Sequence, residues 1–114
     1  MDRNEAITQI RAGLKRRSGK AWSVTGGRGT AWGWLTIDIP ARRRTYAWDG
    51  VTSAGKPDQY ASLAEREELT ALLGLGQLVH PQGESVPASG TYWEEYVDRA
   101  NGRTPSKVGT PYWD

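Results

Sequence analysis

The sequence contains no cysteine, no phenylalanine and a single histidine among its 114 residues. Without cysteine, the chain cannot form disulfides or thiolate metal sites. His80 has no second histidine or cysteine to complete a metal site of the usual types, so we expect no metal and no cofactor. The acidic pairs Glu67-Glu68 and Glu94-Glu95 are interpreted as solvated helix faces, because adjacent helical residues point about 100° apart. Since no nucleophile has a base beside it either, we predict that the protein is not an enzyme.

Long apolar runs are also missing. No segment approaches the roughly 20 apolar residues that a membrane span needs, so we expect no contact with a membrane. The opening residues MDRNEAITQI begin with charge and contain no apolar run, unlike a signal peptide. We therefore expect a cytoplasmic protein, folded as one domain over residues 1–114.

Charge is divided unevenly between the two halves of the chain. Residues 1–56 hold 11 Lys and Arg against 4 Asp and Glu, a net of +7, and residues 57–114 hold 4 against 9, a net of −5, which together give the overall +2. A basic half favours an acidic partner such as nucleic acid. Alternatively, the two halves face each other, either within the fold or between the copies of a homodimer.

The first helix is predicted over residues 3–17, ending near Ser18-Gly19. Asp2 and Glu5 match a capping box, and an apolar stripe follows at helical spacing: Ala6, Ile7, Ile10 and Leu14. The last turn holds three cations, which suit the negative end of the helix dipole without any ligand: Lys15, Arg16 and Arg17.

Two further helices are predicted in the second half. One starts near Ser62, again with a capping box, is ended by Gly74 and Gly76, and is expected to bury Leu63, Leu69, Leu72 and Leu73. The other covers about residues 91–100, closes at Asn101-Gly102, and is expected to pack through Tyr92, Trp93, Tyr96 and Val97. The segment HPQGESVPASG between them is predicted as a polar loop, and the tail RTPSKVGTPYWD as irregular, docked through Tyr112 and Trp113.

A hairpin is predicted between residues 20 and 39, with GGRG as its turn. A turn centred on Gly27-Arg28 places Val24 opposite Ala31 and Trp22 opposite Gly33, where the glycine leaves room for the indole ring. Because strand side chains alternate, one face becomes apolar: Trp22, Val24, Leu35, Ile37 and Ile39. We expect this face to join the core.

Trp32 and Trp34 fall on the other face of that hairpin, among serine and threonine. Their rings would stand roughly 7 Å apart along a strand, as on the aromatic platforms that bind single-stranded nucleic acid. Alternatively, a helix or the C-terminal tail covers this face and both rings belong to the core.

Residues 45–48 are predicted as a third strand that follows the basic run Arg42-Arg43-Arg44. The fold class is therefore α+β, with the order α-β-β-(β)-α-α: a small curled antiparallel sheet with helices packed mainly on one face. The arginine run is either part of a binding site or a solvated edge that prevents mispairing of strands.

Several segments resemble a family of small domains found in bacteria, phages and conjugative elements, one of the large polyvalent protein-associated domains: KRRSGKAWSVTGGRGTAWGWLTI, GLGQLVHPQG, EEYVDRANGR and the closing PYWD. The resemblance covers nearly the whole chain, and its most distinctive parts are the hairpin 22–34 and the end 112–114. Such domains travel in proteins that enter a host cell with mobile DNA. The resemblance implies a role in host takeover or in evading defence, and it implies no catalytic set.

The leading hypothesis is a small nucleic-acid-binding module of this mobile-element or phage type. Its cations would contact phosphates and its two indoles would stack on bases, which gives the candidate site Arg16, Arg17, Lys20, Arg28, Trp32, Trp34, Arg42, Arg43 and Arg44. The alternative is a non-enzymatic inhibitor or adaptor that binds a host defence protein through the same Trp and Arg residues, which are favoured at protein interfaces. Only the first hypothesis predicts binding that weakens steeply with salt.

Overall fold

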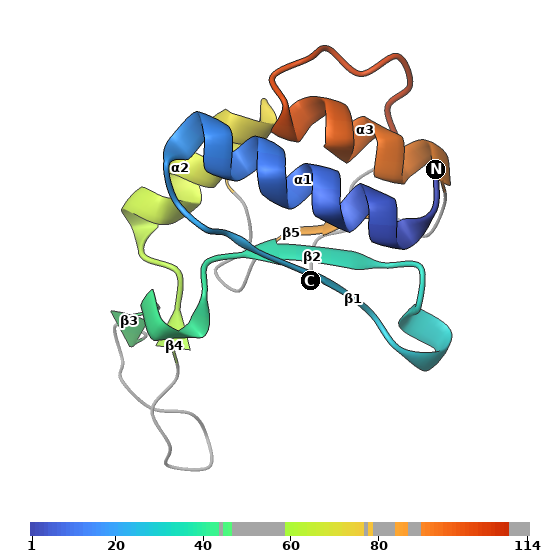
Figure 1. Cartoon of the computed structure of the whole chain (residues 1–114). Coiled ribbons are helices and arrows are strands. Elements are labelled where there is room, and N and C mark those ends of the chain that lie inside the picture. The colour runs from blue at the N-terminus through green and yellow to red at the C-terminus, as the bar shows by residue number, and fades with distance from the viewer. Residues whose placement is uncertain (44, 47–58, 77, 79–83, 87–89, 110–114) are drawn as a thin grey trace.

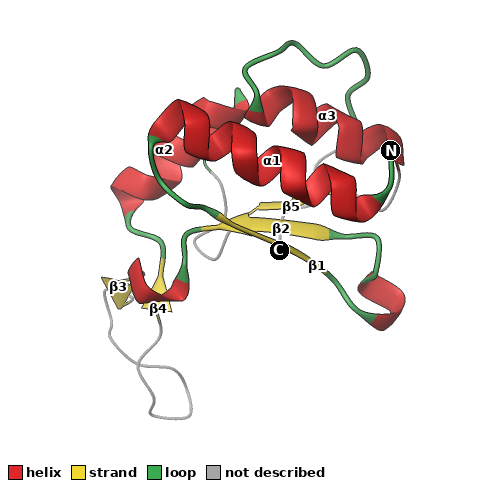
Figure 2. Ribbon diagram, in the orientation of Figure 1, coloured by secondary structure: helices red, strands yellow, loops and turns green. Residues whose placement is uncertain are grey.

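The computed structural model describes residues 1–43, 45–46, 59–76, 78, 84–86 and 90–109. The helices are α1 (Arg3–Ser18), α2 (Leu63–Leu73) and α3 (Gly90–Ala100), and two 3₁₀ turns are η1 (Gly29–Ala31) and η2 (Ala41–Arg43). The strands are β1 (Ser23–Gly26), β2 (Leu35–Asp38), β3 (Thr45–Tyr46), β4 (Gln59–Tyr60) and β5 (Glu84–Val86). The predicted α+β class is confirmed, with helices packed on one face of the sheet (Figures 1 and 2).

Helix α1 begins and ends at the residues that local chemistry favours. The Asp2 carboxylate accepts a hydrogen bond of 2.8 Å from the Glu5 backbone N–H, and Gly19 closes the helix in the left-handed conformation with φ 74°. The predicted bounds are therefore confirmed. So is the apolar stripe, since Ala6, Ile10 and Leu14 are fully buried and Ile7 packs against the core.

The main sheet has the antiparallel order β1-β2-β5. Val24 pairs with Ile37 and Gly26 with Leu35, so the predicted register, with Val24 opposite Ala31, is wrong. Residues 29–31 form a 3₁₀ turn and Trp32 has helical torsion angles, so the connection is a loop over residues 27–34 and not a tight turn. The expected packing of Gly33 against Trp22 is wrong for the same reason.

The predicted core face is confirmed although the register is not. Trp22, Val24, Leu35, Ile37 and Ile39 are all buried in the core. The partner of Val24 moved by six positions, from residue 31 to residue 37, and an even shift keeps every side chain on its face. On the opposite face, Thr25 is exposed and Thr36 is half-buried.

Two strand predictions need correction. The segment expected to be a polar loop contains β5, which pairs with β2 through Thr36 and Ser85 and widens the main sheet. The expected third strand is shorter than predicted and does not join that sheet: β3 pairs with β4 in a separate two-stranded ribbon. Trp48, at the end of the predicted strand, lies outside the described residues.

The two later helices start and end close to the predicted residues. Ser62 caps α2, accepting a hydrogen bond of 3.2 Å from the Glu65 N–H, and Gly74 closes it with φ 66°. Leu63, the first residue of α2, was expected to be buried and is 55% exposed, so that prediction is wrong. In α3, Glu95 was expected to be solvated and is 3% exposed.

Glu95 is buried because both of its carboxylate oxygens have donors. Oε2 accepts a hydrogen bond of 2.8 Å from Arg99 Nε, one turn further along α3. Oε1 accepts one of 2.7 Å from the backbone N–H of Gly109. Through this carboxylate, α3 holds the end of the loop 101–109 that arches beside it in Figure 1.

The C-terminal ends of the three helices are joined by arginines. Arg17 Nη1 donates to three carbonyl oxygens, those of Leu72 at 2.7 Å, Arg99 at 2.9 Å and Ala100 at 3.0 Å. Arg99 Nη1 donates to the carbonyls of Leu73 at 3.0 Å and Gly74 at 3.1 Å. These contacts satisfy carbonyls that have no partner within their own helices.

We predict that Arg17→Ala lowers the free energy of unfolding by about 1–2 kcal/mol, because it leaves the carbonyl ends of α2 and α3 without this donor. Urea denaturation would measure the change. Lys15→Ala is the matched control, since Lys15 lies in the same last turn, is exposed, and its side chain forms no hydrogen bond or ion pair with the described residues. Equal stability of the two variants would contradict the assignment.

Candidate interaction site at the hairpin loop

The predicted site residues do not form one cluster. Arg28 and Trp32 lie in the hairpin loop, beside Arg3 at the start of α1. Arg16 and Arg17 lie in the last turn of the same helix. The 14 steps from Arg3 to Arg17 span roughly 21 Å along the helix axis at 1.5 Å per residue.

Most cations at the far end of α1 are engaged within the protein. Arg16 donates to the Asn101 side chain, and Arg17 donates to the helix-end carbonyls. Lys20 pairs with Glu68 at 2.8 Å, and Arg43 pairs with Glu65 at 3.4 Å while its guanidinium lies 5.5 Å from the Trp22 ring centre. The two ion pairs join the basic half to the acidic half, as expected if the halves face each other within the fold.

The remaining predicted residues differ from one another. Arg42 lies in η2 and is exposed, and Arg44 is outside the described residues. Trp34 comes directly before β2 and is half-buried. Trp32 was predicted to lie on a strand, but it closes η1 instead. The expected pair of indoles along one strand is therefore wrong.

Trp32 is 54% exposed. It therefore does not belong to the core. Its ring is nevertheless held: the Arg3 guanidinium carbon lies 4.3 Å from the ring centre, and the Trp93 ring meets it edge to face at 6.0 Å and 65°. Such contacts add about 0.5–1 kcal/mol each at exposed sites.

Arg3 also holds the loop backbone. Its Nη1 donates to the carbonyls of Trp32 at 2.6 Å and Gly27 at 2.9 Å. On the other side, the buried Trp93 donates from Nε1 to the Gly33 carbonyl at 2.9 Å. Both ends of the turn that carries Trp32 are thus tied to helices, and we call this unit, Arg3 with Gly27 and Trp32, the Arg3 latch.

Gly26, before the loop, and Gly29, within it, have distinct roles. A Cβ on Gly26 would lie 2.6 Å from Arg3 Nη1, so glycine is needed for the guanidinium to cross the strand. Gly29 takes the left-handed conformation, with φ 57°. Arg3 was not among the site residues predicted from the sequence. One pattern could have identified it: a cation in the first turn of a helix faces the positive end of the helix dipole, so it needs another partner.

Among the described residues of the segments that meet near Trp32, positive and negative groups are equal in number. The nearby start of α1, the loop and the start of α3 contribute three positive groups, the N-terminal amine, Arg3 and Arg28, against three acids, Asp2, Glu5 and Glu94. The amine lies 4.0 Å from Glu94, and Met1 is 46% exposed. The described residues of this end therefore combine exposed apolar side chains with equal numbers of positive and negative groups.

The described residues contain no group of three His, Cys, Asp or Glu side chains that could hold a metal ion. His80 lies outside the described residues. Among the helices that are described, none is long and apolar enough to cross a membrane. The hairpin loop presents an indole, a guanidinium and backbone polar groups.

We predict that Arg3→Ala changes the environment of Trp32, because it removes the cation over the ring and two bonds to the loop. The indole N–H resonance of Trp32, identified with Trp32→Phe, should shift in a ¹H–¹⁵N spectrum. Arg11→Ala is the matched control: Arg11 also donates from α1 to the hairpin, to the Val24 carbonyl at 2.9 Å, but it does not touch Trp32. A Trp32 resonance that stays in place, or that moves equally in both variants, would refute the latch.

Gly26→Ala should open the same latch from the other side. The added methyl group would overlap Arg3 Nη1 and displace the guanidinium at a cost of about 1 kcal/mol. We expect the Trp32 shift seen in Arg3→Ala, and no further shift when both substitutions are combined. Gly76→Ala is the control, since a Cβ there meets no atom within 4 Å. If the Trp32 indole N–H resonance of Gly26→Ala kept its wild-type chemical shift, the predicted clash between this methyl group and Arg3 would be contradicted.

The chain was compared with family models, curated proteins and solved structures. No protein-family model matches it, and no curated protein or solved structure matches it either. The resemblance to the large polyvalent protein-associated domains therefore stays a prediction.

Proposed function

We propose that the protein is a non-enzymatic binding module of the cytoplasm that recognises another protein through the hairpin loop, as an inhibitor or adaptor. The observation that carries this proposal is Trp32, which is 54% exposed and yet held by Arg3 and Trp93. Tryptophan and arginine are the residues that most often dominate binding energy at protein interfaces. A side chain that is already ordered loses less conformational entropy on binding, which favours affinity.

The charge around the loop supports a protein partner over a nucleic acid. Phosphate recognition relies on several exposed cations in one place. Here the positive and negative groups near Trp32 are equal in number, and Arg17, Lys20 and Arg43 make contacts within the fold. Nucleic-acid binding stays a prediction from the sequence, and the experiment below includes it as an outcome.

Arg28 gives the proposed surface its polar contact. It is exposed, it precedes η1 with an extended backbone, and it has no partner in the described structure. The fitting partner surface is an apolar pocket for the indole of Trp32 with a carboxylate beside it for Arg28. A guanidinium at the rim of an interface sets orientation and association rate more than affinity.

We predict that Trp32→Ala lowers affinity for the partner by about 30-fold or more, the loss of 2 kcal/mol that defines a dominant interface residue. The wild-type protein would be used to capture partners from a bacterial lysate, and the captured protein would then be titrated calorimetrically against each variant. Leu63→Ala is the matched control, because Leu63 is an equally exposed apolar residue, at 55%, outside the hairpin loop.

Two outcomes would reject this proposal. One is a purified partner that binds Trp32→Ala as tightly as wild type. The other is direct binding of labelled single- or double-stranded DNA or RNA that weakens steeply between two salt concentrations, which would favour the nucleic-acid function instead.

A further inference from the structure

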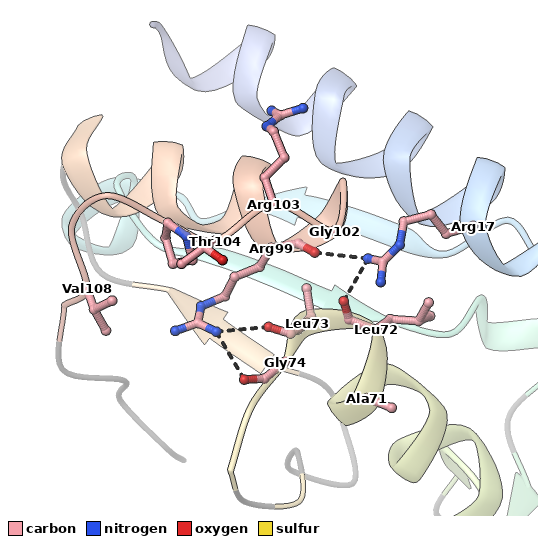
Figure 3. Close-up of a pocket in the computed structure, with 11 residues that line it drawn as sticks. Arg17, Ala71, Leu72, Leu73, Gly74, Arg99, Gly102, Arg103, Thr104 and Val108 are labelled. Atoms are coloured by element: carbon pink, nitrogen blue, oxygen red, sulfur yellow. Dashed lines mark hydrogen bonds between the residues drawn. The ribbon is translucent and has the colours of Figure 1, made fainter.

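A groove of about 430 Å³ lies at the opposite end of α1 from Trp32, where the last turns of α2 and α3 meet the loop after α3 (Figure 3). Pockets of about 300–1,000 Å³ hold drug-sized ligands, so this groove has room for an indole ring. Arg17 lines the groove and Arg3 holds Trp32, so the two sites lie roughly 21 Å apart along α1. An indole of the same copy therefore does not reach the groove.

The outer wall of the groove is apolar and anchored. Val108 is 63% exposed, and Leu72 and Pro105 are half-buried. The loop that carries Pro105 and Val108 is tied to α3 at Gly109, through the 2.7 Å bond to the buried carboxylate of Glu95. Covering this exposed wall with another apolar group stabilises a complex by about 25 cal/mol per Å² of apolar area.

The guanidinium of Arg99 forms the floor of the groove. Its Nε donates to Glu95 at 2.8 Å, and its Nη1 donates to the carbonyls of Leu73 at 3.0 Å and Gly74 at 3.1 Å. Figure 3 shows this guanidinium between Val108 and the end of α2. The Arg99 side chain keeps 14% of its surface exposed, and a ring that enters the groove can stack on that surface.

Charge favours the hairpin loop as the occupant of the groove. Asp98 lies beside the groove, where it pairs with Arg103 at 3.0 Å and keeps 28% of its side chain exposed. Arg28, in the hairpin loop, is exposed and has no partner among the described residues. The loop comes from the half of the sequence with a net charge of +7, and Asp98 from the half with −5. The groove thus combines an apolar wall for an indole with a carboxylate for a guanidinium.

We propose that this groove binds the hairpin loop of a second copy of the chain, with the indole of Trp32 against Val108 and Arg99 and with Arg28 paired to Asp98. One face of the indole is already covered by Arg3, at 4.3 Å from the ring centre, so the opposite face meets the groove. This inference rests on the proposed recognition through Trp32 and names a partner for it.

The contact joins two different surfaces, so a pair of copies still has one free loop and one free groove. Such a contact adds further copies in a chain, whereas a contact between identical surfaces stops at a dimer. A single loop in a groove buries less than the roughly 1,200 Å² of a stable complex, so the association is weak and reversible. The mean mass should therefore rise with concentration and pass that of a dimer.

Sedimentation of the intact protein between about 10 µM and 1 mM would test the proposal. Wild type should associate. Trp32→Ala removes the indole and Val108→Lys puts a cation where Arg28 approaches, so each should weaken association at least tenfold. Leu63→Lys is the matched control, because Leu63 is 55% exposed and does not line the groove, and it should associate like wild type. Monomeric wild type, undiminished association of either groove or loop variant, or an equal loss in Leu63→Lys would overturn the proposal.

Mixing the two deficient variants tests the head-to-tail arrangement. Trp32→Ala retains the groove and Val108→Lys retains the indole, so an equimolar mixture should form dimers and nothing larger. In ¹⁵N-labelled Trp32→Ala, the backbone amides of Gly74 and Gly102, which line the groove, should shift when unlabelled Val108→Lys is added. Unlabelled Trp32→Ala should cause no such shift. A mixture that stays monomeric, or unchanged amides at both glycines, would rule out this contact.

Failure of this inference can be told apart from failure of the proposed function. The sedimentation sample contains only this chain, so monomeric wild type rejects self-association and leaves recognition of another protein through Trp32 intact. The proposed function fails instead when Trp32→Ala binds a captured partner as tightly as wild type does.

Discussion

The meeting of three helix C-termini is the constraint on which the helical layer depends. Each helix end carries about half a negative charge on carbonyls without partners in the helix, so bringing such ends together is unfavourable unless cations lie between them. Arg17 and Arg99 supply five hydrogen bonds to the ends of α2 and α3, and Glu95 holds Arg99 in position. With this junction satisfied, α1 can approach α3 closely enough for Gly13 to face Asn101, where a Cβ would lie 2.7 Å from the amide.

Arginine performs a related task at the other end of α1, with a different result. Arg3 binds two loop carbonyls, as Arg17 binds helix-end carbonyls, but its guanidinium also lies over an indole that remains 54% exposed. One end of the helix is thereby closed and the other presents a fixed aromatic side chain. A count of basic residues cannot distinguish these uses, because a guanidinium that caps a carbonyl and one that awaits a ligand contribute the same charge.

The features that could be predicted from the sequence are those that depend on neighbours in the chain. Helix ends followed from Asp2, Ser62 and the glycines that close each helix, and the core face of the hairpin followed from alternation alone. The register did not, because a 3₁₀ turn after Arg28 has no distinctive composition. Strand β5 was missed since three residues in a polar segment become a strand only when β2 lies beside them. The contacts of Arg17 join residues 55 to 83 positions apart, which no local pattern encodes.

Trp32 and Trp34 differ in exposure although they are close in the sequence. Trp32 and Trp34 are two positions apart, and the sequence analysis treated them as equivalent. The turn at η1 separates them: Trp34 follows the end of the loop into the sheet and is half-buried, whereas Trp32 closes the turn and projects from it. Trp93, 60 residues away from Gly33, ties that turn to α3 with a buried hydrogen bond. A ring tied in this way retains a defined orientation while exposed to solvent, which a flexible surface tryptophan does not, and this is the property that a binding partner can exploit.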